Sequence, residues 1–424
     1  MAPPGFDHGR VESLTAALSD EYGPPGDSPG RWATAAGSPL GGHPSRVEIV
    51  RAPVAVNLMG DDADYNDGFV LPAAIGLETW IAFRRRPDGR VRVASRDSET
   101  VGSFRIEALV PAQAGHDPCS EGEPDAWIDL VAATAWSLRE SALPIHGFDG
   151  LVDAAVPTGA GFAPAAALEL ASAVALLGGA VVAAPALAAI AQRGEREYLG
   201  LDCGIVDQLV SAAGREGKAL MIDCRTLDFR YVPLPFGVRI VVCTTGLDSQ
   251  SGHALHELRR VECARAVSLL AERMPGLSSL RDLDAASLRR HRGVLPENVA
   301  RRAEHVISEN ARVTATAAAL EACDLDELGR LFAESHESIR DRYEVGSEAV
   351  EALVDVATAI PGVVASRTTG SGDGGATVNL VLADAVPALE AAVGREYRRR
   401  TGLEGHVYAV EVVDGAGWIN PAVG

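Results

Sequence analysis

The feature that most restricts the fold is a long charge-free stretch at residues 170–192. A helix of that length is long enough to span a bilayer. The stretch is rich in alanine, however, and a Gly-Gly pair and a proline interrupt it, while Glu169 and Arg193 flank it closely. Because Gly-Gly and Pro break helices, two shorter helices buried against a core are expected rather than a membrane span. The opening MAPPGFDHGRVESL also lacks the apolar region of a signal peptide.

The charge balance excludes some classes of partner. The 424 residues include 38 Lys and Arg against 58 Asp and Glu, a formal net charge of −20. Such an acidic chain repels nucleic acid and anionic membranes, so neither is expected as a partner. An anionic ligand such as a nucleotide then needs a metal ion or a locally positive pocket. The six cysteines form no CxxC pair and are too few for a disulfide scaffold, which predicts reduced thiols in a cytoplasmic protein.

The order of patterns along the chain predicts an α+β protein with two mixed lobes. An amphipathic helix is expected within residues 1–20, followed by a Gly-, Pro- and Ser-rich loop at 22–44. The expected strands are 47–50, 54–59, 81–85, 91–95, 219–223, 230–232, 238–243, 376–382 and 407–412. The expected helices are 125–141, 164–192, 253–273, 296–322, 325–343, 347–358 and 384–400. Strands 81–85 and 91–95 flank Pro-Asp-Gly and are predicted to form a hairpin. We divide the chain into an extension at 1–45 and lobes at 46–235 and 236–424.

Four segments carry candidate chemistry, and the first is APVAVNLMGDDADYNDGFVLP at residues 52–72. An apolar strand ends near Gly60, and a turn then presents Asp61, Asp62, Asp64 and Tyr65. Carboxylates accept hydrogen bonds from several hydroxyls at once, so the turn suits a polyol site. Taken alone, the segment fits an acidic surface turn equally well.

Two further segments are glycine-rich. VPTGAGFAPAAALE at residues 156–169 leads into a helix N-terminus, where free backbone N–H groups and the helix dipole attract phosphate. SRTTGSGDGGATVNLVL at residues 366–382 is a glycine-dense turn that runs into a strand and suits close approach of a ligand to the backbone.

The remaining segment is LDCGIVDQLVSAAG at residues 201–214, where Asp207 stands among apolar residues. An acid in such a position is a candidate base or metal ligand. A helix N-cap is the alternative interpretation.

In this order and spacing, the four segments resemble those of galactokinases in the GHMP kinase superfamily, from about residue 46 to the C-terminus. The first resembles the signature P-G-R-V-N-L-I-G-E-H-T-D-Y-N-D-G, and the second resembles the phosphate loop P-x-G-A-G-L-S-S-S-A. The third resembles G-I-M-D-Q with its catalytic aspartate, and the fourth M-T-G-G-G-F-G-G. Weaker similarities at MIDCRTL, LRRVECA and ESHESIRDRYEV support the register.

The resemblance implies a two-lobed GHMP-kinase-like fold with the active site in the interlobe cleft. It implies transfer of the ATP γ-phosphoryl group, with Mg²⁺, to a sugar hydroxyl, the anomeric one in galactokinases. Asp207 then takes the place of the catalytic carboxylate, and Glu169 that of a metal ligand. The implied sugar-binding residues are Asp61, Asp62, Asp64, Tyr65, Gly204 and His256. The implied nucleotide- and phosphate-binding residues are Pro157, Gly159, Ala160, Gly161, Ala165, Gly370, Gly372 and Gly374.

The sequence departs from the family where the chemistry occurs. The signature arginine, which neutralises charge beside the catalytic aspartate, is Ala55 here. The three serines of the phosphate loop are Ala163, Pro164 and Ala165, so a hydroxyl and a backbone N–H are lost. The Glu-His pair of the signature reads Asp61-Asp62. His256 stands where the family has a tyrosine that contacts the sugar, and Asp373 where it has a phenylalanine.

Two hypotheses follow from these departures. The first is a working kinase with a changed acceptor, a sugar or a sugar-like polyol such as a cyclitol. The second is a non-catalytic relative, a sugar-binding sensor or regulator that kept the cleft and lost the transfer. A nucleotide-free structural protein is a third and weaker alternative. By analogy with the family, a monomer or small homo-oligomer is expected.

Overall fold

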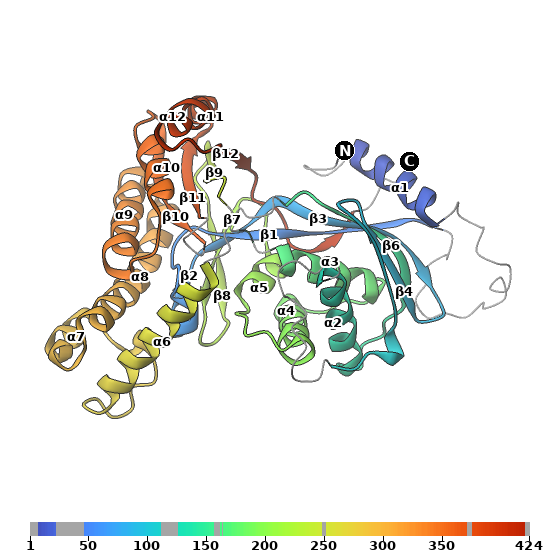
Figure 1. Ribbon diagram of the computed structural model, residues 1–424, viewed down its shortest axis with the longest axis horizontal. Coiled ribbons are helices and arrows are strands. Elements are labelled where there is room, and N and C mark those ends of the chain that lie inside the picture. The colour runs from blue at the N-terminus through green and yellow to red at the C-terminus, as the bar shows by residue number, and fades with distance from the viewer. Residues whose placement is uncertain are drawn as a thin grey trace.

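The computed structural model describes residues 7–22, 46–111, 126–156, 162, 164–247, 252–370 and 375–419. Figure 1 shows two mixed lobes of helix and strand, which confirms the predicted α+β class. Each lobe is organised around its own sheet, and long strands of the first lobe run toward the second.

The N-terminal lobe contains a six-stranded sheet with the order β13-β1-β3-β6-β4-β5. Its strands are β1 (Glu48–Asn57), β3 (Pro72–Arg86), β4 (Arg90–Ser95), β5 (Ser98–Arg105), β6 (Gly147–Ala154) and β13 (Gly417–Trp418). The predicted strands 47–50 and 54–59 are one continuous strand, β1, with a register shift between Pro53 and Val54. A bulge of this kind lets proline, which lacks an N–H, stay within a paired strand.

Helices cover both faces of this sheet (Figure 1). One face is covered by α2 (Ala126–Glu140), α3 (Pro164–Leu177), α4 (Ala184–Arg193) and α5 (Val206–Ala213). The predicted N-terminal helix is α1 (His8–Tyr22), and it lies on the opposite face. Its Leu14 and Leu18 are fully buried against Trp80 and Leu151 of the sheet. The segment therefore contributes to the core of this lobe.

The predicted hairpin of residues 81–85 and 91–95 is wrong in its pairing. Strands β3 and β4 follow each other across Asp88 and Gly89, but β6 lies between them, antiparallel to β3 and parallel to β4. Asp149 of β6 contributes to this arrangement, because Arg86 of β3 and Arg92 of β4 both form ion pairs with it, at 3.0 and 2.6 Å. The strands β5 and β6 were not predicted.

The charge-free stretch forms the two helices expected of it, but only α3 is buried, because α4 buries Leu187, Ala188 and Ala191 and exposes its other side. Helix α3 ends at Leu177, Gly178 and Gly179 adopt positive φ angles, and α4 begins at Ala184. Almost every residue of α3 beyond its first turn is buried beneath β1 and β3. Among the described helices, none has the length and apolar character needed to cross a membrane.

The C-terminal lobe contains a four-stranded sheet with the order β10-β11-β9-β12, and a small sheet β2-β7-β8 joins the two lobes. The strands are β2 (Phe69–Val70), β7 (Lys218–Asp223), β8 (Phe229–Pro233), β9 (Val238–Thr244), β10 (Val363–Thr369), β11 (Ala376–Leu382) and β12 (His406–Val410). Strands β8 and β9 belong to different sheets, as a division near residue 235 predicts. Strand β13 nevertheless returns to pair with β1, so the division remains a prediction.

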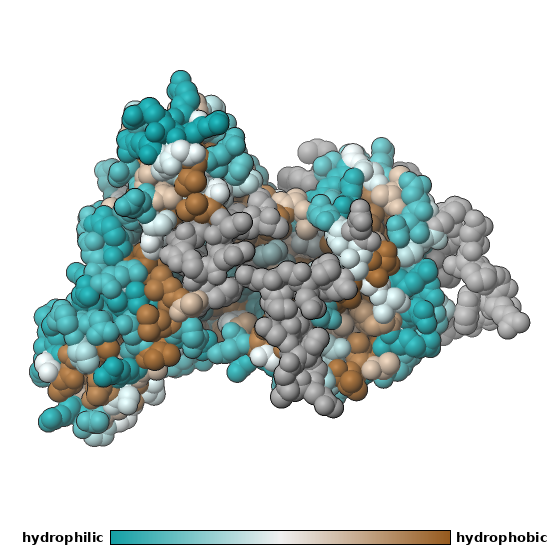
Figure 2. Space-filling model, viewed as in Figure 1, coloured by the Kyte–Doolittle hydropathy of each residue, from teal (hydrophilic) through white to brown (hydrophobic). Residues whose placement is uncertain are grey.

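Helices of the second lobe pack against its sheet and form a separate core farther out. These helices are α6 (Gly252–Ala271), α7 (Ala285–His291), α8 (Glu297–Ala322), α9 (Leu325–Ser338), α10 (Glu348–Thr358), α11 (Val386–Ala392) and α12 (Arg398–Thr401). The separate core joins α6, α7 and α8 through Cys263, Leu288 and Val306. Hydrophilic side chains cover most of the visible face of α8 to α12, as expected for an acidic chain (Figure 2).

Candidate active site

A cavity of about 440 Å³ lies between the lobes, at the carboxyl end of β1. Seven residues proposed from the sequence line it: Asp61, Asp62, Asp64, Gly204, Asp207, His256 and Gly370. Tyr65 does not line the cavity, although it contacts two residues that do. Ala165 and Glu169 lie on α3, away from the described wall. Pro157, Gly159, Ala160, Gly161, Gly372 and Gly374 lie outside the described residues.

The turn after β1 presents the first three carboxylates because its backbone bends sharply. Gly60 has φ +103°, and a Cβ there would lie 2.6 Å from the carbonyl oxygen of Phe69. Asp62 has a left-handed conformation with φ 64°, and a 3₁₀ turn begins at Asp64. This compact turn places carboxylates of neighbouring positions on one wall of the cavity.

Asp61 is held by a buried arginine of the other lobe. Arg367 of β10 has no exposed side-chain surface, and its Nη2 lies 2.6 Å from Asp61 Oδ2. Asn57 donates a second hydrogen bond to Asp61 at 2.7 Å. Burial raises the pKa of Asp61 to about 6, because it outweighs the favourable charge of Arg367. The ion pair therefore joins the turn after β1 to the C-terminal sheet.

Asp62 and His256 form a second contact between the lobes. Nδ1 of His256, on α6, lies 3.2 Å from Oδ1 of Asp62. Tyr65 donates to the same Asp62 oxygen at 2.9 Å, and its ring meets the imidazole edge to face at a centroid distance of 5.2 Å. The hydrogen bond that His256 donates to Asp62 raises the pKa of His256, which favours the imidazolium form facing the cavity.

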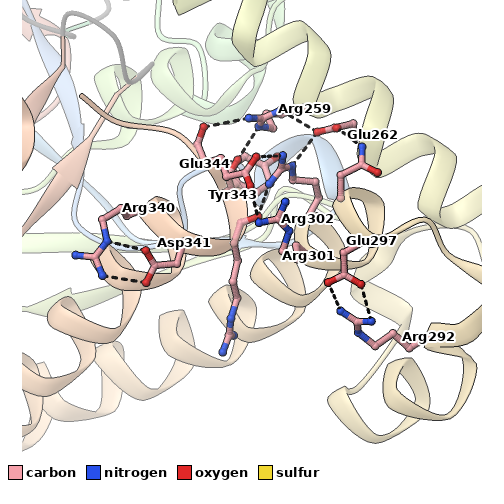
Figure 3. A network of polar contacts seen from close by, with 12 residues as sticks. Arg259, Glu262, Arg292, Glu297, Arg301, Arg302, Arg340, Asp341, Tyr343 and Glu344 are labelled. Carbon is pink, nitrogen blue, oxygen red and sulfur yellow. Dashed lines mark hydrogen bonds and ion pairs between the residues drawn. The ribbon is translucent and has the colours of Figure 1, made fainter. Parts of the chain in front are cut away.

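An ion-pair network fixes the helix that carries His256 (Figure 3). Arg259 Nε donates to the carbonyl oxygen of Tyr343 at 2.6 Å, and its Nη1 contacts Glu262 at 2.9 Å. Arg302 of α8 contacts the same Glu262 at 2.8 Å and Glu344 at 2.6 Å. Both arginine side chains are almost fully buried, so these contacts hold α6 firmly against α8.

The contact between His256 and Asp62 predicts a pH-dependent stability. Because the folded-state pKa of His256 is raised, its stabilisation is complete below the unfolded pKa of about 6.5 and is lost as pH rises through the folded value. His256→Gln should therefore lower the melting temperature below about pH 6.5, with the difference shrinking at higher pH. Thermal melts across pH 5 to 9 test this, and the same pH dependence should disappear in Asp62→Asn. A deficit that is constant over the whole range would contradict the assignment.

Asp207 stands in the first turn of α5, which forms another part of the cavity wall. Its carboxylate is open to the water of the cavity, yet surrounding protein removes much of its bulk solvation. This burial, together with Asp64, Glu195 and Asp61, raises the pKa of Asp207 to about 7. Burial and Asp62 raise the pKa of Asp64 in the same way. No described residue forms an ion pair with Asp207.

Two more carboxylates lie behind this wall. Gln208 Nε2 lies 2.9 Å from Glu195 Oε2 and 3.3 Å from Glu169 Oε2. Glu169 has no exposed surface, and burial next to Glu195 raises its pKa well above the usual value. Among the described residues, Glu169 Oε1 and Gln208 Oε1 have no hydrogen-bond partner. Within the described part of the chain, no group of three or more His, Cys, Asp or Glu residues forms a metal site.

The fold and the cleft together define the class of protein. Residues 129–215 match the model of the GHMP kinases N terminal domain, and residues 40–85 match the galactokinase galactose-binding signature. A Methanococcus jannaschii mevalonate kinase has the same fold, with a TM-score of 0.62 at 15% identity, over 87% of this chain and 99% of that one. The protein is therefore an enzyme of the GHMP kinase class.

Within this class, the chain belongs to the galactokinase family of ATP-dependent sugar kinases. It is 40% identical to a galactokinase of Chloroflexus aurantiacus, over 85% of this chain and 90% of that protein. It is 39% identical to a galactokinase of Roseiflexus, over 87% and 92% of the two chains. The structure of Lactococcus lactis galactokinase complexed with galactose has a TM-score of 0.83 at 27% identity, over 96% of this chain and 99% of that one. These findings confirm the predicted family, fold and enzyme class.

Sequence reasoning missed three residues that shape the site. Arg367 is the second residue of the glycine-dense segment 366–382. It is the single charged residue of β10, and a lone arginine in an otherwise uncharged strand indicates a buried ion pair. Glu195 lies in a charged run, GEREY, that resembles an exposed helix end. Asp202 lines the cavity and pairs with Arg260 of α6 at 2.8 Å, a contact that depends on the packing of distant segments.

Proposed function

We propose that this protein transfers the γ-phosphoryl group of ATP to the anomeric hydroxyl of a hexose bound in the cavity, with Asp207 as the catalytic carboxylate. The observation that carries the proposal is a carboxylate on the cavity wall with a pKa of about 7, which suits a base that works near neutral pH. The proposed sugar-binding carboxylates Asp61, Asp62 and Asp64 line the same cavity. A cyclitol is the alternative acceptor.

The proposed reaction is a direct transfer. The hydroxyl oxygen of the sugar bonds to the γ-phosphorus, and the bond between that phosphorus and the β,γ-bridging oxygen breaks. Asp207 accepts the hydroxyl proton, and ADP leaves. Asp64 and the pair of Asp62 and His256 orient the ring hydroxyls, since carboxylates accept hydrogen bonds and imidazolium donates them.

The chain also has oxygen donors suited to the metal that the family implies. Mg²⁺ prefers oxygen ligands and usually takes one or two carboxylates together with substrate phosphates. Glu195, and Glu169 as predicted from the sequence, fit this preference, because both carry raised pKa values and Glu169 Oε1 lacks a partner within the described part of the chain. When bound there with ATP, the ion would neutralise phosphate charge. Ala165 offers no hydroxyl as a further ligand.

The proposal is tested by measuring ADP release from full-length protein with Mg·ATP and a panel of neutral hexoses, amino hexoses and cyclitols. ADP should form only when one of these acceptors is present, and the product should be a sugar 1-phosphate. The control omits the acceptor and measures ATP hydrolysis by water. Binding of a sugar without ADP release would contradict the proposal and support the non-catalytic sugar sensor. Monomeric or small oligomeric assembly and a cytoplasmic location remain predictions.

A further inference from the structure

The described wall of the cavity has an unusual charge. Five aspartates line it, at positions 61, 62, 64, 202 and 207, but no Arg or Lys does, and His256 is its one basic side chain. The segments 157–161 and 371–374, which the family resemblance places at the phosphates, also contain neither Lys nor Arg. A neutral sugar would leave this charge uncompensated.

Three cations that reach the cavity-lining aspartates already have a carboxylate partner. Arg367 pairs with Asp61, His256 with Asp62 and Arg260 with Asp202, at 2.6, 3.2 and 2.8 Å. Two aspartates remain without such a partner among the described residues, Asp64 and Asp207. They lie near each other. Asp64 Oδ2 lies beside Gly204, three residues before Asp207, and the charge of Asp64 acts on the carboxyl group of Asp207. When both are ionised, these two carboxylates therefore place uncompensated negative charge at one place.

The substitution at position 55 explains why the cavity wall lacks a positive charge for these two aspartates. Ala55 lies on β1, is nearly buried and lines the cavity where the family signature has its arginine. The short side chain of Ala55 leaves empty the space that an arginine would occupy, and it supplies no positive charge. Position 62 makes the cavity more negative still, because an aspartate replaces the histidine of the signature. A ligand that brings its own cation would fill this space and pair with the two aspartates.

A neighbouring amide independently indicates a ligand that donates hydrogen bonds. Asn57 lines the same cavity, and its Nδ2 donates to Asp61 at 2.7 Å. Its Oδ1 has no hydrogen-bond partner in the described part of the chain and is closed off from solvent. A buried acceptor without a donor is costly. A small shift of the side chain on binding would let an ammonium or hydroxyl group satisfy it.

From this arrangement we propose that the acceptor is an amino sugar, a hexose with a protonated amine on the carbon next to the reacting hydroxyl. The inference rests on the proposed function, because it names the substrate class of that same site. The ammonium lies between Asp64 and Asp207 and supplies the positive charge that the family takes from its arginine. The transfer step is the one described above. The hydroxyl proton passes to Asp207 and ADP leaves, while the ammonium keeps its protons throughout.

Calorimetric titration of the full-length protein at neutral pH tests the inference independently of catalysis. The probes are D-galactosamine, D-galactose and N-acetyl-D-galactosamine, of which only the first carries a cation. We expect galactosamine to bind at least about tenfold more tightly than either neutral sugar, which corresponds to about 1.4 kcal/mol. Equal or weaker binding of galactosamine overturns the inference.

Two variants identify the charge as the cause. Ala55→Arg fills the space with a fixed cation and should abolish the preference for galactosamine, whereas Val181→Arg should keep it. Val181 is a matched control because its side chain is almost fully exposed. It follows the C-terminal end of α3 and does not line the cavity. Asp64→Asn, which keeps the shape of the side chain, should reduce the preference as well. A preference that persists in both cavity variants also overturns the inference.

ADP release with the same sugars separates this inference from the proposed function. If galactosamine binds preferentially but no sugar yields ADP, the ligand class stands and the kinase proposal fails. If galactose and galactosamine bind equally and both yield ADP, the kinase stands and the amino-sugar inference fails.

Discussion

Asp207→Asn is expected to lower kcat for phosphoryl transfer by about 10²- to 10⁴-fold, the usual contribution of a general base. Affinity for a neutral sugar such as galactose should be kept or improved, because Asn retains a hydrogen-bond acceptor and removes one negative charge from a crowded cavity. Single-turnover rates and calorimetric titration measure the two effects separately. In the wild type, the rate should rise as pH increases through about 7, as the carboxylate of Asp207 loses its proton.

The same substitution should stabilise the protein at high pH. The pKa of Asp207 is raised to about 7 in the folded state, so the folded protein binds more protons than the unfolded chain between about pH 4 and 7. Stability therefore falls as pH rises through that interval, and Asn removes this loss. Asp207→Asn should melt at a higher temperature than the wild type above pH 7 and at a similar temperature near pH 4.

The control for this prediction is Asp228→Asn, the same change at an exposed position between β7 and β8. It should leave both kcat and its pH dependence unchanged. Full activity of Asp207→Asn would remove Asp207 from the mechanism. Lost activity without the gain in stability would instead indicate that the carboxylate already has a cationic partner in the folded protein.

The parts of the site that the sequence predicted are those encoded locally. The turn with Asp61, Asp62 and Asp64 follows directly from a strand, a glycine and a 3₁₀ turn that are consecutive in the chain. The two helices α3 and α4 are likewise set by a Gly-Gly pair between apolar residues. His256 was placed at the sugar site through the family resemblance, and the structure brings it to within 3.2 Å of Asp62.

The parts that were missed depend on contacts between distant segments. Strand β6 inserts between β3 and β4 because Asp149 meets arginines more than fifty residues earlier, which no local pattern encodes. The pairing of Arg367 with Asp61 links residues 306 positions apart. The phosphate-loop predictions at Pro157, Gly159, Ala160 and Gly161 lie outside the described residues and stay predictions. Local patterns in the sequence thus predict which side chains belong to the candidate site, but they do not predict the distant residues with which those side chains pair.

Arg367→Met is expected to reduce the free energy of unfolding by about 3–5 kcal/mol, the usual cost of removing one partner from a buried ion pair. Arg367 is fully buried, and it contacts Asp61 at 2.6 Å, the carbonyl oxygen of Leu58 at 3.1 Å and Glu309 at 4.0 Å. Glu309 is also fully buried, and its pKa stays at about 2 because Arg367 and Arg312 outweigh the effect of burial. Without Arg367, two buried carboxylates lose a compensating charge.

Denaturant unfolding measures this loss, and two further variants show its origin. Arg330→Met removes an exposed arginine from ion pairs with Glu327 and Glu334, so it should cost less than about 1 kcal/mol. Arg367→Lys keeps the charge but not the planar group that reaches Leu58 and Asp61 together, and it should fall between the other two. A loss below about 1 kcal/mol for Arg367→Met would contradict a structural role for the pair.

Adding Asp61→Asn to Arg367→Met should recover part of the lost stability, because it removes one of the two carboxylates left without a partner. The recovery measures the coupling between the lobes, since Arg367 belongs to β10 and Asp61 to the turn after β1. Sugar affinity should not recover in the double variant, because Asn at position 61 keeps the fold of the turn but changes the charge that faces the ligand. Recovery of stability without recovery of binding would separate the two roles proposed for this ion pair, which are to hold the lobes together and to position Asp61 for sugar binding.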